Sequence, residues 1–222
     1  QATGAMIGIH FPMWLMEGDA VLTETLLTES GRGRMPWFSM PLKAQMLEKG
    51  IYGYDKAYLG SYRNFVPDYY VMGYHFVTGA RQWAGHDIWQ KVASDLVPNA
   101  WYPFQFSRQI KQYSGHNKIG LYAAVYDSLK IKWANEDLKT ITTPFTQITQ
   151  PDKSFKNYLY AQPTSFGTWI AEVDGPGQVN RFVEIAPNGK EHTVAVPGYK
   201  NDEPFSYKAQ RMVWSEQMDH LR

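Results

Sequence analysis

The period of the hydrophobic pattern changes near residue 140, and this change constrains the possible folds more than any other feature of the sequence. Before it, apolar residues recur at helical spacing, as in Leu121, Val125, Leu129 and Trp133. After it, short alternating runs are separated by Gly, Pro and Asn, which is typical of strands and turns. The sequence therefore predicts an α+β chain in which a helical part precedes the strands.

Helices are predicted in the first part from apolar periodicity and from Pro or Gly near the helix ends. The first is expected to begin after Pro12 and to be followed by Gly31 as a left-handed cap. The expected helices cover residues 13–29, 41–49, 67–83, 87–97 and 117–137. We assign residues 1–140 to one helical subdomain, which we expect to be incomplete.

Residues 141–154 are rich in Thr, Pro and Gln, and we interpret them as a linker. Strand-like runs follow at residues 158–161, 167–173, 181–185, 192–196 and 211–215. Asn188-Gly189 lies between two of these runs and predicts a hairpin, because both residue types tolerate positive φ. Residues 151–222 are therefore expected to form the start of an antiparallel β-propeller or part of a sandwich.

The ends of the sequence suggest a piece of a larger protein. The chain begins at Gln1 with no recognisable leader, and the last strand-like run ends close to Arg222. A single propeller blade leaves an apolar face and an edge uncovered. We therefore expect the missing parts of the same polypeptide to lie beyond both ends.

Composition excludes several classes of function. A formal net charge of +1 gives no broad basic field, so nucleic acid is not expected as a partner. There are no cysteines, which excludes disulfides, thiolate metal sites and thiol nucleophiles. No stretch approaches the roughly 20 apolar residues of a membrane span, so no transmembrane segment is predicted. Neither a P-loop nor a G-x-S-x-G nucleophile elbow occurs.

The most informative acid is Glu17, within Trp14-Leu15-Met16-Glu17-Gly18-Asp19-Ala20. It lies one turn into a mostly apolar helix, beside a glycine that permits a close backbone approach. A carboxylate there is costly unless it is paired, protonated or bound to a metal. The alternative interpretation is an acid that only interacts with the positive end of the helix dipole.

This segment, followed by Thr23-Glu24-Thr25, resembles the W-x-x-E-G-x-A motif of gluzincin-type zinc metallopeptidases. In that family the Glu follows a H-E-x-x-H helix and is the third zinc ligand. Further segments resemble a family of bacterial envelope proteins that join such a peptidase-like domain to a TolB-like β-propeller. They are Ser30-Gly31-Arg32-Gly33-Arg34, Tyr58-Leu59-Gly60-Ser61-Tyr62, Phe65-Val66-Pro67-Asp68-Tyr69-Tyr70, Pro103-Phe104-Gln105-Phe106-Ser107, and Arg181-Phe182-Val183 with Asn188-Gly189.

The resemblance covers nearly the whole chain and implies that Glu17 is a zinc ligand. Two histidines one helical turn apart would supply the other protein ligands, and the Glu between them would activate a zinc-bound water. No His in this sequence has a second His four residues later, and none is followed directly by Glu. We therefore expect the pair upstream of Gln1 or lost, and no peptide hydrolysis by these 222 residues alone.

Other site residues are also implied by the resemblance. Related peptidases place a Tyr on a later helix, where it stabilises the oxyanion of the tetrahedral intermediate; Tyr70 and Tyr74 are the candidates, with core packing as the alternative. Arg32 and Arg34 are candidates to bind a substrate carboxylate through bidentate hydrogen bonds. The alternative is that they bind carbonyls at the end of the preceding helix. His75 is a further candidate donor, with an exposed histidine or one already hydrogen-bonded within the chain as its alternative.

For the intact protein, the resemblance implies zinc-dependent peptide-bond hydrolysis at the bacterial cell envelope, in the periplasm or at the outer-membrane surface. Its partners would be a peptide or protein substrate, or other envelope proteins. The alternative is a non-catalytic scaffold whose propeller mediates protein–protein interaction at the outer membrane. A third hypothesis is carbohydrate binding by aromatic faces. It requires exposure of Trp83, Trp89, Trp101 and Trp133, which we expect in the core instead.

Overall fold

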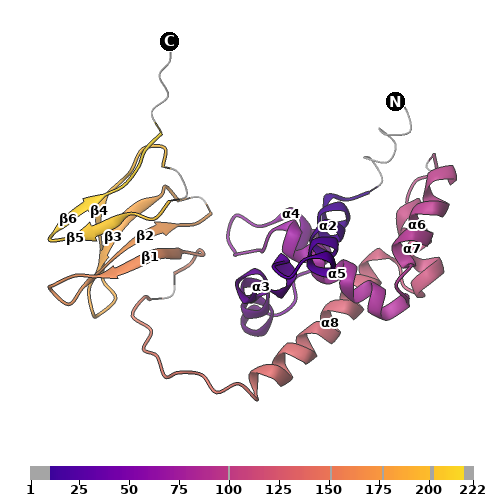
Figure 1. Ribbon diagram of the computed structural model, residues 1–222, viewed down its shortest axis with the longest axis horizontal. Coiled ribbons are helices and arrows are strands. Elements are labelled where there is room, and N and C mark those ends of the chain that lie inside the picture. Colours follow the sequence, from indigo (N-terminus) through magenta and orange to yellow (C-terminus); the bar gives the residue numbers. More distant parts are fainter. Residues whose placement is uncertain (1–10, 100, 151, 177, 201–202, 218–222) are drawn as a thin grey trace, which may run out of the picture. The chain divides into compact units, whose positions relative to one another are not determined.

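The computed structural model describes residues 11–99, 101–150, 152–176, 178–200 and 203–217. They form a mixed structure of helices and strands with a four-stranded antiparallel sheet (Figure 1), which confirms the α+β class at this level. Contacts divide the chain into two compact units. Unit 1 comprises residues 1–60 and 66–141, and unit 2 comprises residues 61–65 and 142–222.

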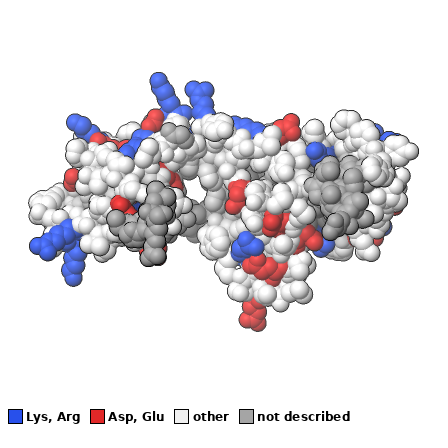
Figure 2. Space-filling view, turned by 90° about the horizontal axis from the view of Figure 1, so that it is seen from above, with Lys and Arg blue, Asp and Glu red and all other residues white. Residues whose placement is uncertain are grey.

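Unit 1 is helical, with seven α-helices and two short 3₁₀ helices in its described residues. They are α2 (Met13–Leu27), η1 (Arg32–Arg34), α3 (Pro36–Lys49), α4 (Tyr54–Leu59), α5 (Tyr69–Ala84), α6 (Ile88–Leu96), η2 (Val97–Asn99), α7 (Gln105–Ser114) and α8 (Lys118–Asp137). No helix of the described chain is both long and apolar enough to span a bilayer. Figure 2 shows basic and acidic side chains on the same face of the molecule, between larger uncharged areas.

Two polar caps set the starts of the longest helices. The Asp68 carboxylate accepts a hydrogen bond from the Val71 amide at 3.0 Å and begins α5. The Asn117 side chain accepts one from the Gly120 amide at 2.8 Å and begins α8. Such caps pair amides that otherwise have no partner within the helix. Both helices therefore start slightly later than predicted.

The prediction of a left-handed cap at Gly31 is wrong. Helix α2 ends before Thr28, and Gly31 has φ −58°, which any residue can adopt. A Cβ atom on Gly31 would lie 2.3 Å from the Cα atom of Thr25. Glycine is needed there because the chain returns against α2, and not because of a positive φ.

The core of unit 1 is built around Trp14, whose side chain is completely buried. Its ring centroid lies 4.6 Å from that of Phe76 and 5.8 Å from that of Trp89. The indole N–H donates a 2.7 Å hydrogen bond to the Tyr54 hydroxyl, so the polar atom of this large ring is also paired. Trp14 therefore attaches α2 to α4, α5 and α6.

The predicted burial of four tryptophans is correct for only two of them. Trp89 and Trp133 are 7% exposed, whereas Trp83 is 47% and Trp101 is 83% exposed. Trp83 lies at the end of α5, where its ring contacts His116 at a centroid distance of 5.5 Å, and Trp101 lies in the segment before α7. Helical spacing identified an apolar position but not whether another element packs on it.

Unit 2 contains the sheet, with strands in the order β1-β2-β3-β4, each antiparallel to the next. The strands are β1 (Asn157–Pro163), β2 (Trp169–Asp174), β3 (Arg181–Ile185) and β4 (Glu191–Ala195), followed by the hairpin of β5 (Ser206–Lys208) and β6 (Arg211–Val213). The predicted hairpin at Asn188-Gly189 is confirmed. Gly189 has φ +80°, and the Ala186 amide donates to the Lys190 carbonyl at 3.0 Å.

Both faces of the sheet carry apolar side chains. Alternation places Ala171, Val173, Val183 and Ile185 on one face, together with Tyr158. Ile170 and Phe182 lie on the other face and pack with Phe205, Tyr207, Met212 and Trp214. The β5–β6 hairpin and the residues next to it therefore cover one face of the sheet (Figure 1).

A short segment from the helical half of the sequence belongs to unit 2. The Phe65 and Phe155 rings pack with their centroids 4.7 Å apart, and the Phe155 amide donates to the Arg63 carbonyl at 3.3 Å. The hydrophobic period does not reveal this grouping, because residues 61–65 form neither a helix nor a strand. The expected linker, residues 141–154, likewise contains no helix or strand in its described part.

Candidate functional site

Two glycines bring α2 and α5 into direct backbone contact. A Cβ atom on Gly73 would lie 2.0 Å from the Trp14 carbonyl oxygen and 3.0 Å from the Gly18 Cα atom, both on α2. Only residues without a Cβ atom allow two helices to approach this closely. The Gly18 of the W-x-x-E-G-x-A segment therefore has a packing role, as does the buried Trp14.

This contact places Glu17 beside Tyr70. The side chains of both residues are partly exposed. Partial burial and the neighbouring Glu17 carboxylate raise the pKa of the Tyr70 hydroxyl above its ordinary value, so the hydroxyl is protonated at neutral pH. The Tyr70 ring also stacks on Tyr69, with centroids 4.9 Å apart. A carboxylate that can bind a cation thus lies next to a phenol that can donate a hydrogen bond.

The η1 turn adds a cation to this surface. The Glu24 carboxylate accepts hydrogen bonds from the Arg32 backbone amide at 3.0 Å and from Arg32 Nε at 2.8 Å. These bonds lower the pKa of Glu24, the backbone bond contributing most. The Arg32 guanidinium lies 5.4 Å from the centroid of the Tyr70 ring. Arg32 is therefore held by an acid of this chain and contacts the tyrosine that neighbours Glu17.

Tyr74 follows Tyr70 by one helical turn on α5, and Arg34 is the last residue of η1. The Tyr74 hydroxyl donates to the Gly33 carbonyl at 3.4 Å, and burial raises its pKa while the nearby Arg34 charge lowers it. Arg34 Nη1 donates to the Thr28 carbonyl at the end of α2, as the capping alternative for this arginine expected. Of the two candidate tyrosines, Tyr70 is therefore the one beside Glu17.

His75 has its own partners elsewhere on α5. Its Nε2 atom lies 3.0 Å from the Ser39 hydroxyl, and its ring packs against Trp133 at 5.1 Å. Burial, with a smaller contribution from the Lys132 charge, lowers the pKa of His75 to about 3. The imidazole is therefore neutral at ordinary pH and links α3, α5 and α8. The contact with Ser39 matches the alternative in which His75 is hydrogen-bonded within the chain.

The predicted site residues thus gather on α2, η1 and α5, although they come from separate parts of the sequence. Glu17, Tyr70 and Arg32 form one continuous group, which we call the α2–α5 site, with Tyr74 and Arg34 beside it. Glu17 is the one member of the W-x-x-E-G-x-A segment in this group. Within the described residues, no three His, Asp or Glu side chains come close enough to hold a metal ion.

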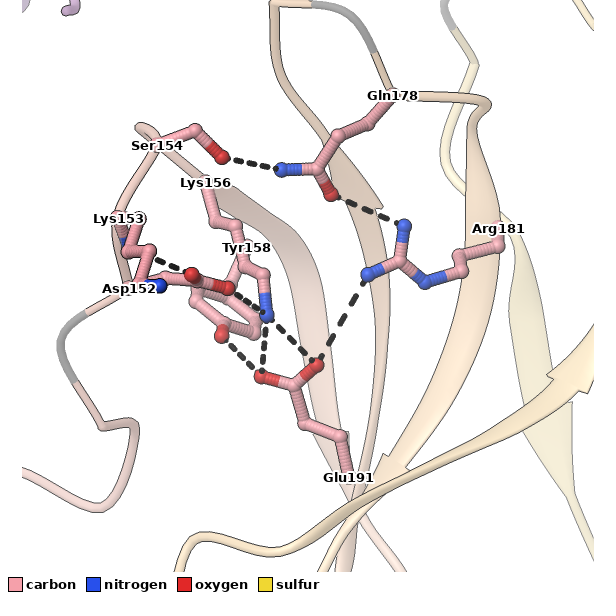
Figure 3. Close-up of polar contacts among 8 residues, drawn as sticks. All are labelled: Asp152, Lys153, Ser154, Lys156, Tyr158, Gln178, Arg181 and Glu191. Carbon is pink, nitrogen blue, oxygen red and sulfur yellow. Dashed lines mark hydrogen bonds and ion pairs between the residues drawn. The ribbon is translucent and has the colours of Figure 1, made fainter. Parts of the chain in front are cut away.

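Sequence reasoning missed a second polar group, on the sheet of unit 2 (Figure 3). The Glu191 carboxylate accepts from the Tyr158 hydroxyl and pairs with Lys156 at 3.3 Å and Arg181 at 4.0 Å. Lys156 also pairs with Asp152 at 2.8 Å. Lys156 and Tyr158 are two residues apart, the spacing of one strand face, which is the one sequence signal for this group.

The charges of this second group are balanced within the chain. Two carboxylates face two cations, and each has a partner in the same cluster. Hydrogen bonding to Asp152 raises the pKa of Lys156, and burial followed by the Glu191 interaction raises that of Tyr158. The cluster ties the segment before β1 to the sheet, so we assign it a structural role.

No protein-family model, curated protein or solved structure gives a significant match to this chain.

Proposed function

We propose that this chain is part of a zinc-dependent, metallopeptidase-like protein of the bacterial cell envelope, with Glu17 as a metal ligand. One observation carries the proposal: the Glu17 carboxylate and the Tyr70 hydroxyl lie side by side on two different helices, and both remain partly exposed. Trp14 and Gly18 of the same segment are explained by packing. Glu17 is not, and a partly exposed carboxylate is a suitable ligand for zinc.

In this proposal, two histidines that lie outside the given sequence would complete the protein ligands. The bound zinc would polarise a peptide carbonyl and lower the pKa of a bound water. From this chain, Glu17 would offer one carboxylate oxygen to the zinc. Tyr70 would donate a hydrogen bond from its protonated hydroxyl. In this proposal that hydroxyl would donate to an oxyanion as it forms, which is where such a donor contributes most.

Arg32 would take a lesser part in substrate binding than its sequence position suggests. Its Nε atom is already used by Glu24. The substrate-carboxylate role thus remains a proposal for the outer nitrogen atoms of Arg32 and for Arg34, whose Nη1 atom is engaged by Thr28.

We further propose that unit 2 begins a TolB-like propeller. A blade is a four-stranded antiparallel meander, and the next blade packs on its face. Strands β1 to β4 have this order, and the apolar residues of the β5–β6 hairpin pack on one face of the sheet. Such a propeller would bind a peptide or protein substrate, or another envelope protein.

The propeller also supports the second candidate function, a non-catalytic scaffold at the outer membrane. The two candidates differ in one measurable property of the intact protein, including any sequence upstream of Gln1. Peptide cleavage that a chelator abolishes and added zinc restores is the result expected of the hydrolase. Binding of envelope proteins with no cleavage of a peptide library, at full zinc occupancy, would favour the scaffold instead.

A further inference from the structure

The Glu24–Arg32 pair is more precisely built than a surface ion pair. One carboxylate receives both a backbone amide at 3.0 Å and a guanidinium nitrogen at 2.8 Å from the same residue. Two bonds from one residue fix the direction of the guanidinium, whereas an ordinary exposed pair leaves it free. The pair thus determines where the Arg32 side chain lies.

The surrounding turn is also fixed by close contacts. The Gly33 amide donates to the Thr25 hydroxyl at 3.0 Å. A Cβ atom on Gly33 would lie 2.3 Å from the Tyr74 ring, and Gly31 is equally close to Thr25. The Ser30-Gly31-Arg32-Gly33-Arg34 turn therefore packs directly on α2 and α5, with Arg32 between two glycines that permit this approach.

Arg32 transmits this order to Tyr70. Its guanidinium lies 5.4 Å from the centroid of the Tyr70 ring, within the range of a cation–π contact. The planar guanidinium suits this contact better than an ammonium group does. The ring is also held by Tyr69, and its hydroxyl neighbours Glu17.

We infer that the Glu24–Arg32 pair is a positioning device that holds the Tyr70 hydroxyl against the Glu17 carboxylate. Arg32 touches neither reacting atom, so it is a positioning residue. Its importance for catalysis rests on the proposed function, whereas the contact itself does not. The inference assigns Arg32 a role through Tyr70, which is separate from any binding of a substrate carboxylate by its outer nitrogen atoms.

The test is a double-mutant cycle read by NMR on the full chain, without metal. Tyrosines carry a ¹³Cζ label, and Tyr70→Phe identifies the Tyr70 signal. The coupling energy of the cycle is represented by the change in the ¹³Cζ chemical shift of Tyr70 that Glu17→Gln causes at neutral pH. We call this change the coupling. In an Arg32→Ala background this coupling should fall by roughly half or more, because the hydroxyl is no longer held beside the carboxylate.

Matched variants separate position from charge and from folding. Arg34→Ala removes a cation from the same turn and should leave the coupling unchanged, because Arg34 lies near Tyr74. Arg32→Lys keeps the charge but loses the planar group and the Nε donor, so it should behave like Arg32→Ala. Glu24→Gln should weaken the coupling in the same direction. Where Arg32→Ala does not fold, the Lys and Gln variants give the answer.

An unchanged coupling in folded Arg32→Ala and Arg32→Lys would overturn the inference. A coupling lost in Arg32→Ala but kept in Arg32→Lys would also overturn it, since charge alone would then suffice. The result is independent of zinc binding. If the intact protein binds no zinc but Arg32→Ala shows the expected loss of coupling, the proposed zinc-dependent hydrolysis is wrong. The positioning role of Arg32 is then still supported.

Discussion

Gly18 and Gly73 touch so closely that a Cβ atom on Gly18 would lie 2.2 Å from the Gly73 carbonyl carbon. This contact, between residues that the sequence alone gives no reason to pair, brings Glu17 next to Tyr70. A backbone atom cannot move aside as the end of a flexible side chain can. The geometry of the α2–α5 site therefore depends on Gly18 and Gly73 having no Cβ atom.

Gly18→Ala should lower the free energy of unfolding by about 1–3 kcal/mol, as expected for overpacking in a rigid contact. Gly53→Ala is the matched control, because Gly53 has a negative φ and no atom within 4 Å of the added Cβ. The measurement is urea unfolding followed by tryptophan fluorescence. Equal stability of the two variants would show that α2 and α5 do not approach this closely.

The pH dependence of the free energy of unfolding should show the lowered pKa of His75. Its pKa in the folded protein, about 3, lies below the ordinary value of 6.5, so the unfolded chain binds more protons between these values. Stability should therefore fall as the pH drops below about 6.5, with a contribution from this group of at most about 1.4 kcal/mol per pH unit.

His75→Gln should remove this contribution between pH 6 and roughly pH 4. Unfolding free energies of the wild type and the variant, measured over this range, give the two slopes. The variant should be less pH-dependent whatever its stability at neutral pH. Parallel slopes would show that His75 titrates normally and that its ring is not buried between Ser39 and Trp133.

The buried ion pair of unit 2 offers a third test. Glu172 and Lys200 lie 3.0 Å apart, and both side chains are only 4% exposed. Glu172→Gln removes the carboxylate that pairs with this buried ammonium group and should lower the free energy of unfolding by about 3–5 kcal/mol. Replacing both residues with Met should cost less than the single change, because no buried charge remains.

The control is Glu136→Gln on α8. Its pair with Lys132 is 3.9 Å long, with both side chains about half exposed or more, so its loss should cost no more than about 1 kcal/mol. Hydrogen exchange of the β2 and β3 amides reports the stability of unit 2 specifically. Similar protection in Glu172→Gln and Glu136→Gln would contradict the burial of the first pair.

Kinetics of the intact protein should separate the two tyrosines. If Tyr70 donates to the oxyanion, Tyr70→Phe should lower kcat by roughly 10²–10³ with a smaller change in KM. Tyr74→Phe removes a long hydrogen bond to Gly33 and should leave kcat nearly unchanged. A decrease in kcat in Tyr74→Phe but not in Tyr70→Phe would instead assign the donor role to Tyr74.

Regular elements followed from the sequence where apolar spacing was unambiguous. Leu121, Val125 and Trp133 form the buried side of α8, as their steps of four residues predict. Helix α7 was missed because polar residues such as Gln105 and Gln109 occupy its buried side. It also begins after Phe104, whose φ of +61° is not a usual start for a helix. Strand β5 has only three residues, too few to show alternation.

The site was predictable as a set of residues but not as an arrangement. Glu17 was identified by its motif, and Arg32 by the turn that follows α2. The proximity of Tyr70, and not Tyr74, depends on the backbone contact between α2 and α5, which no spacing encodes. Glu24 was missed as the partner of Arg32, because their contact depends on how the glycine-rich turn folds back.

Zinc content of the intact protein, including any sequence upstream of Gln1, tests the central claim most directly. The wild type should hold about one zinc ion per chain after dialysis, and Glu17→Gln should lose most of it. Asp19→Asn, which alters a neighbouring acid paired with Arg81 at 3.2 Å, should retain the metal. Equal zinc in the wild type and Glu17→Gln, or none in either, would contradict the assignment of Glu17 as a ligand.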